Sequence, residues 1–242
     1  MEEHENIYDK IKELLGSLPS KLNVLEEKID IELQFEYFEQ SRRERTNIRI
    51  DSVLDDSGRL FIKEVPNDEK KIILARIASL GKVEAYRIIE RFLNENPGEL
   101  KNWGILALQE NRMLLESILL DESHVFISTG LGGKGQKLRY FVVLFGKEKK
   151  DFTELQKKII RTEFEICLKK YHSEVEEFNF SGSIANMLVI IPMKVIIKQV
   201  FTEGIKECNQ YGDFLITNFI ITNVKELSFD EIREYVKNQQ HD

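Results

Sequence analysis

The chain has little of the residues that mark several special classes of protein. It contains two cysteines and four prolines among 242 residues, and no stretch approaches eighteen uninterrupted apolar residues. The low cysteine count excludes a disulfide scaffold, and four prolines with 13 glycines exclude collagen-like and low-complexity chains. The missing apolar stretch excludes a membrane-spanning helix. Hydrophobic residues form 42% of the chain, enough for a packed core, so a disordered chain is excluded as well.

The beginning of the sequence lacks the pattern of a secretory signal. Residues Met1–Glu5 are acidic, whereas such a signal is basic and then apolar. Cys167 and Cys208 lie in apolar stretches without a CxxC spacing, so each is expected to be a small buried side chain. We therefore expect a cytoplasmic protein that does not associate with a membrane.

The first of three expected parts, residues 1–66, combines one predicted helix with an ambiguous segment. A helix is expected at 3–15. From Ile29 to Tyr37, apolar and polar residues alternate strictly, which favours a strand, although the many glutamates favour a helix. Two more short strands are expected, at 48–50 and 60–62. Whether residues 20–64 are helical or extended stays open.

The second part, residues 67–120, has the spacing of amphipathic helices. Apolar residues recur every three or four positions, and the stripes stop at Gly81 and at Asn96-Pro97-Gly98. Short helices joined by such turns form antiparallel hairpins that bury one face against the next helix.

Part of this segment resembles a known helical repeat. The run Leu74–Gly81, followed by Val83-Glu84-Ala85 and then by Asn96-Pro97, resembles short HEAT-type repeats over about residues 68–120. The resemblance implies a scaffold or an interaction surface and no chemistry. A plain helical bundle explains the same pattern.

The third part, residues 121–242, predicts an α+β sandwich with a mostly antiparallel sheet and helices on one face. Strands and helices are expected in the order ββαββαβα, the order of two strand pairs that each lead into a helix. The predicted elements are strands at 125–127, 138–145, 175–180, 187–191 and 214–221, and helices at 152–171, 193–208 and after Ser228. Ser228 and Glu231 have the spacing of a capping box for the last helix.

A glycine-rich segment, Gly130–Gly135, is one candidate for a binding site. Four glycines in six residues can expose backbone N–H groups to an anion, and Lys134 and Lys137 add charge. The segment matches neither GxxxxGK[ST] nor GxGxxG, and it joins two expected strands rather than a strand and a helix. A hairpin tip is the alternative.

The strongest electrostatic feature surrounds this segment. Between Lys134 and Lys170 there are eleven basic and five acidic residues, a local charge of +6 in a chain whose total is −7. Such a cluster suits phosphate groups. Its aromatic residues Phe152, Phe164 and Tyr171, however, fall on the apolar stripe of the predicted helix, which disfavours base stacking.

Residues with the spacing of a catalytic or metal site are scarce. The sequence has no HExxH, CxxC or GxSxG pattern. We therefore assign no catalytic residue, metal or cofactor; a non-enzymatic protein is favoured, and whether the chain is an enzyme stays open. The candidate residues for binding an anion or a partner are Gly130, Gly132, Gly133, Lys134, Lys137, Lys157, Lys158 and Arg161.

These patterns support three hypotheses about function. The first is a non-enzymatic interaction or scaffold protein whose partner is another protein. The second is a domain that binds an anionic small molecule or a nucleotide at Gly130–Gly135. The third, which the aromatic pattern disfavours, is nucleic-acid binding through the basic surface from Lys134 to Lys170.

Overall fold

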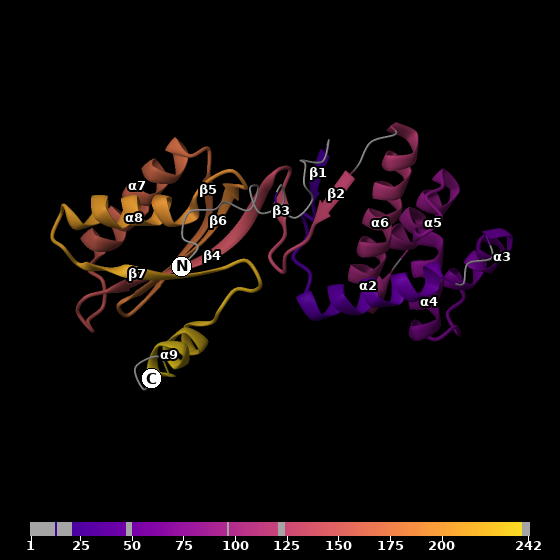
Figure 1. The fold of residues 1–242 in the computed structure, drawn as a ribbon. Coiled ribbons are helices and arrows are strands. Elements are labelled where there is room, and N and C mark those ends of the chain that lie inside the picture. The colour runs from indigo at the N-terminus through magenta and orange to yellow at the C-terminus, as the bar shows by residue number, and fades with distance from the viewer. Residues whose placement is uncertain (1–12, 14–20, 47–49, 96, 121–123, 239–242) are drawn as a thin grey trace. The chain divides into compact units, whose positions relative to one another are not determined.

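The computed structural model describes residues 13, 21–46, 50–95, 97–120 and 124–238. They belong to two compact units (Figure 1). Of the described residues, those within 19–25 and 29–127 form the helical unit, and those within 1–18, 26–28 and 128–242 form the α+β unit. The mixture of helices and an antiparallel sheet confirms the predicted α+β class.

The helical unit contains the hairpins that the apolar spacing predicted. Helix α4 ends before Gly81, and α5 ends before Pro97, as the turn residues indicated. Its described elements are β1 (Lys21–Val24), α2 (Ile31–Arg45), α3 (Ile50–Asp55), the 3-10 helix η1 (Asp56–Phe61), α4 (Asn67–Ala78), α5 (Val83–Asn94), the 3-10 helix η2 (Gly98–Leu100), α6 (Lys101–Leu120) and β2 (His124–Ile127).

The strand favoured for Ile29–Tyr37 is wrong, because this segment begins helix α2. The side chain of Asp30 caps the helix by accepting hydrogen bonds from the N–H groups of Glu32, at 2.8 Å, and Leu33, at 3.3 Å. The alternation was misleading because Phe35, one of the apolar positions, is 67% exposed. The helix instead buries Gln34 and Tyr37, which are three residues apart.

The strand expected at 60–62 is also wrong. Leu60 and Phe61 lie in η1, where Leu60 is buried in the helical core. Of the strand expected at 48–50, only residue 50 is described, and it begins α3. Of the helix expected at 3–15, only Glu13 is described, and it is helical.

A buried carboxylate joins α2 to α6 in the helical unit. The side chain of Glu110 is only 2% exposed and accepts hydrogen bonds from the hydroxyl groups of Tyr37, at 2.5 Å, and Ser41, at 2.7 Å. Arg45 supplies the compensating charge, with its Nη2 at 2.5 Å from Oε1 of Glu110. The ring of Tyr37 also meets the buried ring of Trp103 edge-on, with centroids 5.2 Å apart. The network therefore fixes α2 to the apolar core at several points.

The α+β unit is built on an antiparallel sheet whose main path is β7–β4–β6–β5, with β3 also paired to β4. This strand order, with a helix after β4 and after β6, is the split βαβ arrangement. Its elements are β3 (Gly133–Lys134), β4 (Lys137–Gly146), α7 (Glu154–Lys170), β5 (Glu174–Ser181), β6 (Ile184–Pro192), α8 (Ile197–Asn209), β7 (Leu215–Thr222) and α9 (Phe229–Asn238).

Helices cover both faces of this sheet, which corrects the expectation of helices on one face. On one face, Phe164 of α7 stacks against Phe201 of α8, and Phe201 in turn contacts Phe219 of β7. On the other, Ile232 of α9 packs with Phe141 and other residues of the sheet. Ser228 and Glu231 form the predicted capping box at the start of α9.

One predicted strand belongs to a different sheet from the one expected. Strand β2, expected as the first strand of the sandwich, pairs in parallel with β1 in the helical unit. The separate two-stranded sheet is formed by segments about a hundred residues apart in the chain, which no local pattern could reveal.

Two glycines allow the chain to pass close to other backbone before β3. A Cβ at Gly130 would lie 1.7 Å from the carbonyl oxygen of Val224. Gly132 has φ +66°, and a Cβ there would lie 2.5 Å from the carbonyl oxygens of both Glu26 and Glu27. At Gly135, φ is also positive, +60°, but the space around it is open. The first two glycines are therefore required by packing, and the third by backbone conformation alone.

The buried carboxylate gives a first prediction about stability. We expect Glu110→Ala to lower the free energy of unfolding by about 3 kcal/mol, because two buried hydroxyl groups lose their acceptor. Trp103 is the single tryptophan and lies in the helical core, so its fluorescence in a urea titration reports on this unit. The control variant Glu95→Ala removes only an exposed ion pair with Arg91, so its urea midpoint of unfolding should equal that of the wild type. Equal midpoints for the two variants would contradict the role of Glu110.

The glycine packing gives a second prediction. We expect Gly132→Ala to lower the free energy of unfolding by about 3 kcal/mol, since overpacking adds to the cost of a left-handed backbone. Gly135→Ala is the matched control with the same sign of φ but open space, and we expect a loss of about 1 kcal/mol. Circular dichroism during urea unfolding measures both. If Gly135→Ala proved as destabilising as Gly132→Ala, the close backbone approach would not be the cause.

Candidate functional site

The glycine-rich segment is held by hydrogen bonds within the α+β unit. The N–H groups of Leu131 and Gly132 donate to the carbonyl oxygens of Asn223, at 3.0 Å, and Thr129, at 3.2 Å. At the tip of the β3–β4 hairpin, the N–H of Gly135 donates to a carboxylate oxygen of Glu26, at 3.3 Å. These donors are thus occupied by the protein itself. An anion site at Gly130–Gly135 stays a prediction, and the structure gives Gly130 and Gly132 a separate, packing role.

One of the two lysines of this hairpin reaches the edge strand β5. Lys137 pairs with Glu174 of β5, with its Nζ 3.1 Å from Oε1. This hydrogen bond and the positive charge of Lys137 lower the pKa of the Glu174 carboxyl group, and the charge of Lys134 adds to the effect. Lys134 itself is exposed. The hairpin therefore presents one paired and one exposed ammonium group.

Helix α7 carries the other predicted basic residues on a well-formed scaffold. Thr153 and Gln156 close a capping box at its first turn, and Phe164 buries its apolar face. At its amino end, Lys157 is paired with Glu154, at 2.7 Å. At its carboxyl end, Lys170 is paired with Glu203 of α8, at 2.9 Å. Neither of these two charges is free for a partner without breaking an ion pair.

Three other cations of α7 are not neutralised in this way. Lys158, Arg161 and Lys169 are all exposed, and within the described part of the chain none of them forms an ion pair with a carboxylate. Their spacing of three and then eight residues places them along one side of the helix. Two exposed acidic residues share this side: Glu165 lies among the cations, and Glu154 lies one turn before Lys158.

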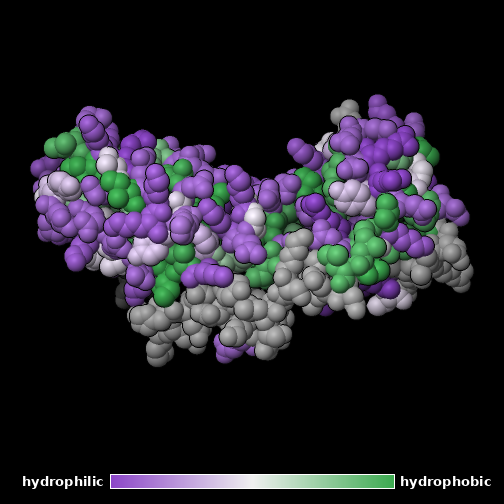
Figure 2. Space-filling model, turned by 90° about the horizontal axis from the view of Figure 1, so that it is seen from above, coloured by the Kyte–Doolittle hydropathy of each residue, from purple (hydrophilic) through white to green (hydrophobic). Residues whose placement is uncertain are grey.

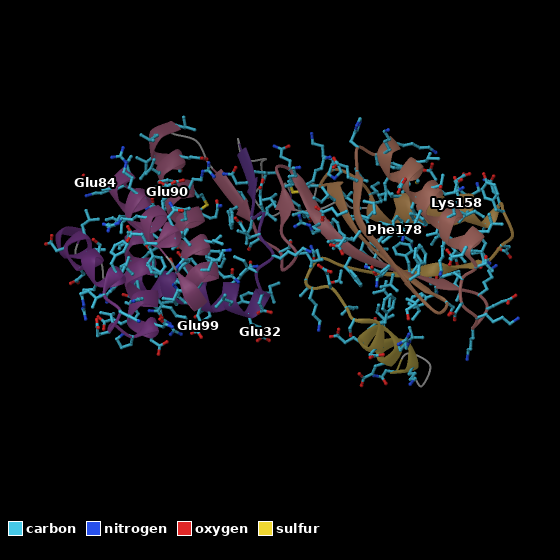
Figure 3. The ribbon with its side chains drawn as sticks, turned by 180° about the vertical axis from the view of Figure 1, so that it is seen from behind. Glu32, Glu84, Glu90, Glu99, Lys158 and Phe178 are labelled. Carbon is cyan, nitrogen blue, oxygen red and sulfur yellow. The ribbon has the colours of Figure 1, made fainter. Side chains whose placement is uncertain are left out.

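Arg161 lies over two phenylalanines that the sequence patterns did not identify. Its guanidinium carbon is 5.4 Å from the ring centroid of Phe178 and 5.1 Å from that of Phe180. The two rings are nearly parallel, with an angle of 6° and centroids 6.1 Å apart. Figure 3 labels Lys158 on α7 and Phe178 on the neighbouring strand β5. Phe152 and Phe164 are buried, as the apolar stripe predicted, but a neighbouring strand supplies two other rings to these basic residues.

A bulge in β5 turns both rings toward α7. The register of β5 against β6 shifts between Val175 and Glu177, so one extra residue is inserted there. Phe178 consequently lies opposite Met187, and Phe180 opposite Ala185, on the side of the sheet that α7 covers. The alternation of apolar and polar residues in β5 is interrupted at this bulge. The apolar residue before it stands at an odd-numbered position, 175, and those after it stand at the even-numbered positions 178 and 180. This break in the alternation is the signal that could have revealed the ring pair.

The predicted site residues do not form a single cluster. The hairpin with Lys134 and Lys137 lies at the amino end of β4, whereas Lys157 and Lys158 follow its carboxyl end in the first turns of α7 (Figure 1). Strand β4 has ten residues and is therefore about 30 Å long. The residues that come together are Lys158, Arg161, Lys169, Phe178 and Phe180, which we call the α7–β5 surface.

Exposed apolar side chains border this surface. Leu155 and Ile166, both on α7, are 68% and 51% exposed. Each lies three residues before one of the free lysines, Lys158 and Lys169, and is therefore its neighbour on the helix. On the face of the molecule in Figure 2, hydrophobic side chains form small islands among hydrophilic ones. The α7–β5 surface is thus a mixture of cations, rings and aliphatic groups.

The two thiols and the Tyr140 hydroxyl group of the α+β unit are shielded from solvent. Burial raises the pKa of the Cys167 thiol to about 11 and that of Cys208 to about 12. Burial also raises the pKa of the Tyr140 hydroxyl group. Among the residues whose placement is described, no group of three or more His, Cys, Asp or Glu side chains is arranged to hold a metal ion. In that same part of the chain, every helix is too short or too polar to cross a membrane.

Comparison with known proteins finds similarity among solved structures only. No family model matches the chain, and no curated protein matches it either. One similar structure, from Deinococcus radiodurans R1, is assigned as a transposase. It is 15% identical over 43% of this chain and 91% of its own, with a TM-score of 0.36. Another is a REP-associated tyrosine transposase bound to a REP hairpin, which is 10% identical over 43% of this chain and 67% of its own, with a TM-score of 0.32.

These findings correct the first functional hypothesis. A non-enzymatic scaffold protein was expected, with another protein as its partner, and this interpretation is wrong because the two solved structures named above are described as transposases. Since these likenesses are distant, the function proposed below rests on the side chains of this chain.

The buried thiols give a third prediction. At about pH 8, a thiol reagent such as Ellman's reagent should react with neither Cys167 nor Cys208 in the folded protein, since both thiols are buried and protonated. The same reagent in denaturant should count both cysteines. Fast reaction of one thiol in the folded protein would contradict the burial of the α7–α8 interface.

Proposed function

We propose that the α+β unit binds nucleic acid through the α7–β5 surface. The observation that carries the proposal is the position of Arg161, an exposed cation held over two parallel rings and not neutralised by any described carboxylate. Positive groups beside aromatic rings are the combination that proteins use to bind the phosphates and bases of nucleic acids.

The ion pairs of the unit support this choice of surface. The local excess of +6 in the sequence suggests a broad basic face, but most of these cations have a partner. Arg139, Lys147 and Lys150 pair with Glu176, Asp213 and Glu148, as Lys137, Lys157 and Lys170 pair with the glutamates described above. A cation that already has a carboxylate partner gains less from a phosphate, because the first ion pair must be given up. The cations that remain for a phosphate backbone are concentrated on α7.

The shape of the surface also favours an extended polyanion. Lys158 and Lys169 are eleven residues apart on one helix, a distance of about 16 Å along its axis. A small anion could contact only one of them at a time, whereas a nucleic-acid strand can contact both. Neutralising phosphates releases condensed counterions, so binding of this kind is strongest at low salt.

The proposal is tested by removing the two free lysines. We expect Lys158→Ala with Lys169→Ala to weaken binding of a labelled DNA hairpin with a single-stranded tail, by roughly tenfold for each lysine that no longer binds a phosphate at about 0.1 M salt. The slope of log K against log salt concentration should become shallower by about one for each of these lysines. Fluorescence anisotropy between about 50 and 200 mM salt measures both quantities.

Two control variants separate this effect from a general change of charge. Lys101→Ala removes an exposed lysine from α6 of the helical unit and should leave affinity and slope unchanged. Glu165→Gln removes an acidic residue on the basic side of α7 and should strengthen binding. If the wild-type protein shows no salt-sensitive binding, or if the double variant binds as tightly as the wild type, the proposal fails.

A further inference from the structure

We infer that the ligand is single-stranded nucleic acid, with one unpaired base stacked on the outer face of the Arg161 guanidinium group. The inference rests on the proposed function and goes beyond it, because free lysines alone would serve a duplex equally well. What distinguishes the two ligands is the flat group that Arg161 presents together with Phe178 and Phe180.

The two rings under the guanidinium group of Arg161 have a rigid support. Phe180 packs edge-on against Phe152, with ring centroids 6.2 Å apart, and Phe152 is buried and makes a similar contact with Phe214. Phe178 lies parallel to Phe180 on the same strand. The platform is therefore continuous with the core of the unit. An arginine held in this way loses little conformational freedom when a base stacks on it.

The outer side of the platform is accessible. Arg161 is exposed, and β5 is an edge strand that pairs with β6 alone in the described part of the sheet. Because no described carboxylate binds the guanidinium group, its N–H donors can reach a phosphate or the edge of a base. Proteins that recognise unpaired nucleotides stack their bases on aromatic side chains or on arginine planes.

The neighbouring residues suit a strand that passes over this platform. Lys158 lies about 4.5 Å before Arg161 along the helix axis, and Lys169 about 12 Å after it, so phosphates on both sides of a stacked base meet a cation. The exposed Leu155 and Ile166 offer apolar contacts beside each lysine. In a duplex, both faces of each internal base are already stacked on its neighbours, so a duplex can use the lysines but not the platform.

The test separates the plane of Arg161 from its charge. Arg161→Lys keeps the positive charge and loses the flat group. We expect it to weaken binding of a single strand of about 16 nucleotides by about tenfold, and to change binding of the matching blunt duplex by less than about twofold. Lys169→Ala is the matched control that removes charge only, and it should weaken binding of both ligands by a similar factor.

A second variant and a second signal guard against an unfolding artefact. Phe178→Leu keeps an apolar side chain and removes one of the two rings. It should therefore also weaken binding of the single strand and leave binding of the duplex nearly unchanged. A 2-aminopurine base in the strand reports stacking directly, and its fluorescence change on binding should disappear in Arg161→Lys. Thermal denaturation establishes that each variant is folded.

Each outcome has one interpretation. Equal affinity of the wild-type protein for the strand and the duplex would overturn the inference, and so would an Arg161→Lys variant that binds the single strand as the wild type does. In both cases salt-sensitive binding would leave the proposed function intact. Binding of neither ligand at low salt would instead overturn the proposed function itself.

Discussion

The guanidinium group of Arg139 joins three parts of the α+β unit and holds the bulged part of β5 to the central strand β4. From the central strand β4, it donates to Glu176 of β5 at 2.5 and 3.1 Å. It also donates to the carbonyl oxygen of Leu131 at 2.6 Å and to that of Glu26 at 3.4 Å. Its side chain is only 13% exposed. Charge-assisted bonds in so shielded a position are strong, and four of the five N–H donors of this cation are used inside the unit.

The contact of Arg139 with Glu176 has a consequence on the opposite side of the sheet. Glu176 is the residue inserted at the bulge of β5, between the two positions where the register shifts. An inserted residue reverses the side to which all later side chains point. The bulge therefore directs Glu177 away from α7 and directs Phe178 and Phe180 toward it. The ion pair on one face thus helps to place the ring pair, and with it Arg161, on the other.

The sequence was most informative where a single local signal decided the structure. In the α+β unit, the apolar periodicity predicted α7 at 152–171, against the observed Glu154–Lys170, and the spacing of Ser228 and Glu231 predicted the cap of α9. Around Ile29 two local signals conflicted. Strict alternation favoured a strand, but the cap at Asp30 and the burial of Tyr37 against Glu110 made a helix. Tertiary contacts of this kind override a two-residue period.

The site was predicted only in part, because its ingredients come from different elements. The sequence placed Lys158 and Arg161 on one helix face, since helical spacing is a local property. It could not show that Lys157 and Arg139 have carboxylate partners, because the partner of Arg139 lies on another strand and that of Lys157 depends on its rotamer. Counting charges in a segment therefore overestimates the surface available to a phosphate backbone.

Charge and shape contribute separately to recognition at the α7–β5 surface. Lys158 and Lys169 act as hydrated point charges, so their contribution depends on salt and is the same for any polyphosphate. Arg161 carries the same charge but spreads it over a flat, weakly hydrated group that rests on two rings. The energy of stacking on such a group depends on whether a base face is available and hardly on ionic strength. In the proposed complex, one helix face thus attracts any nucleic acid through Lys158 and Lys169 and selects among nucleic acids through Arg161.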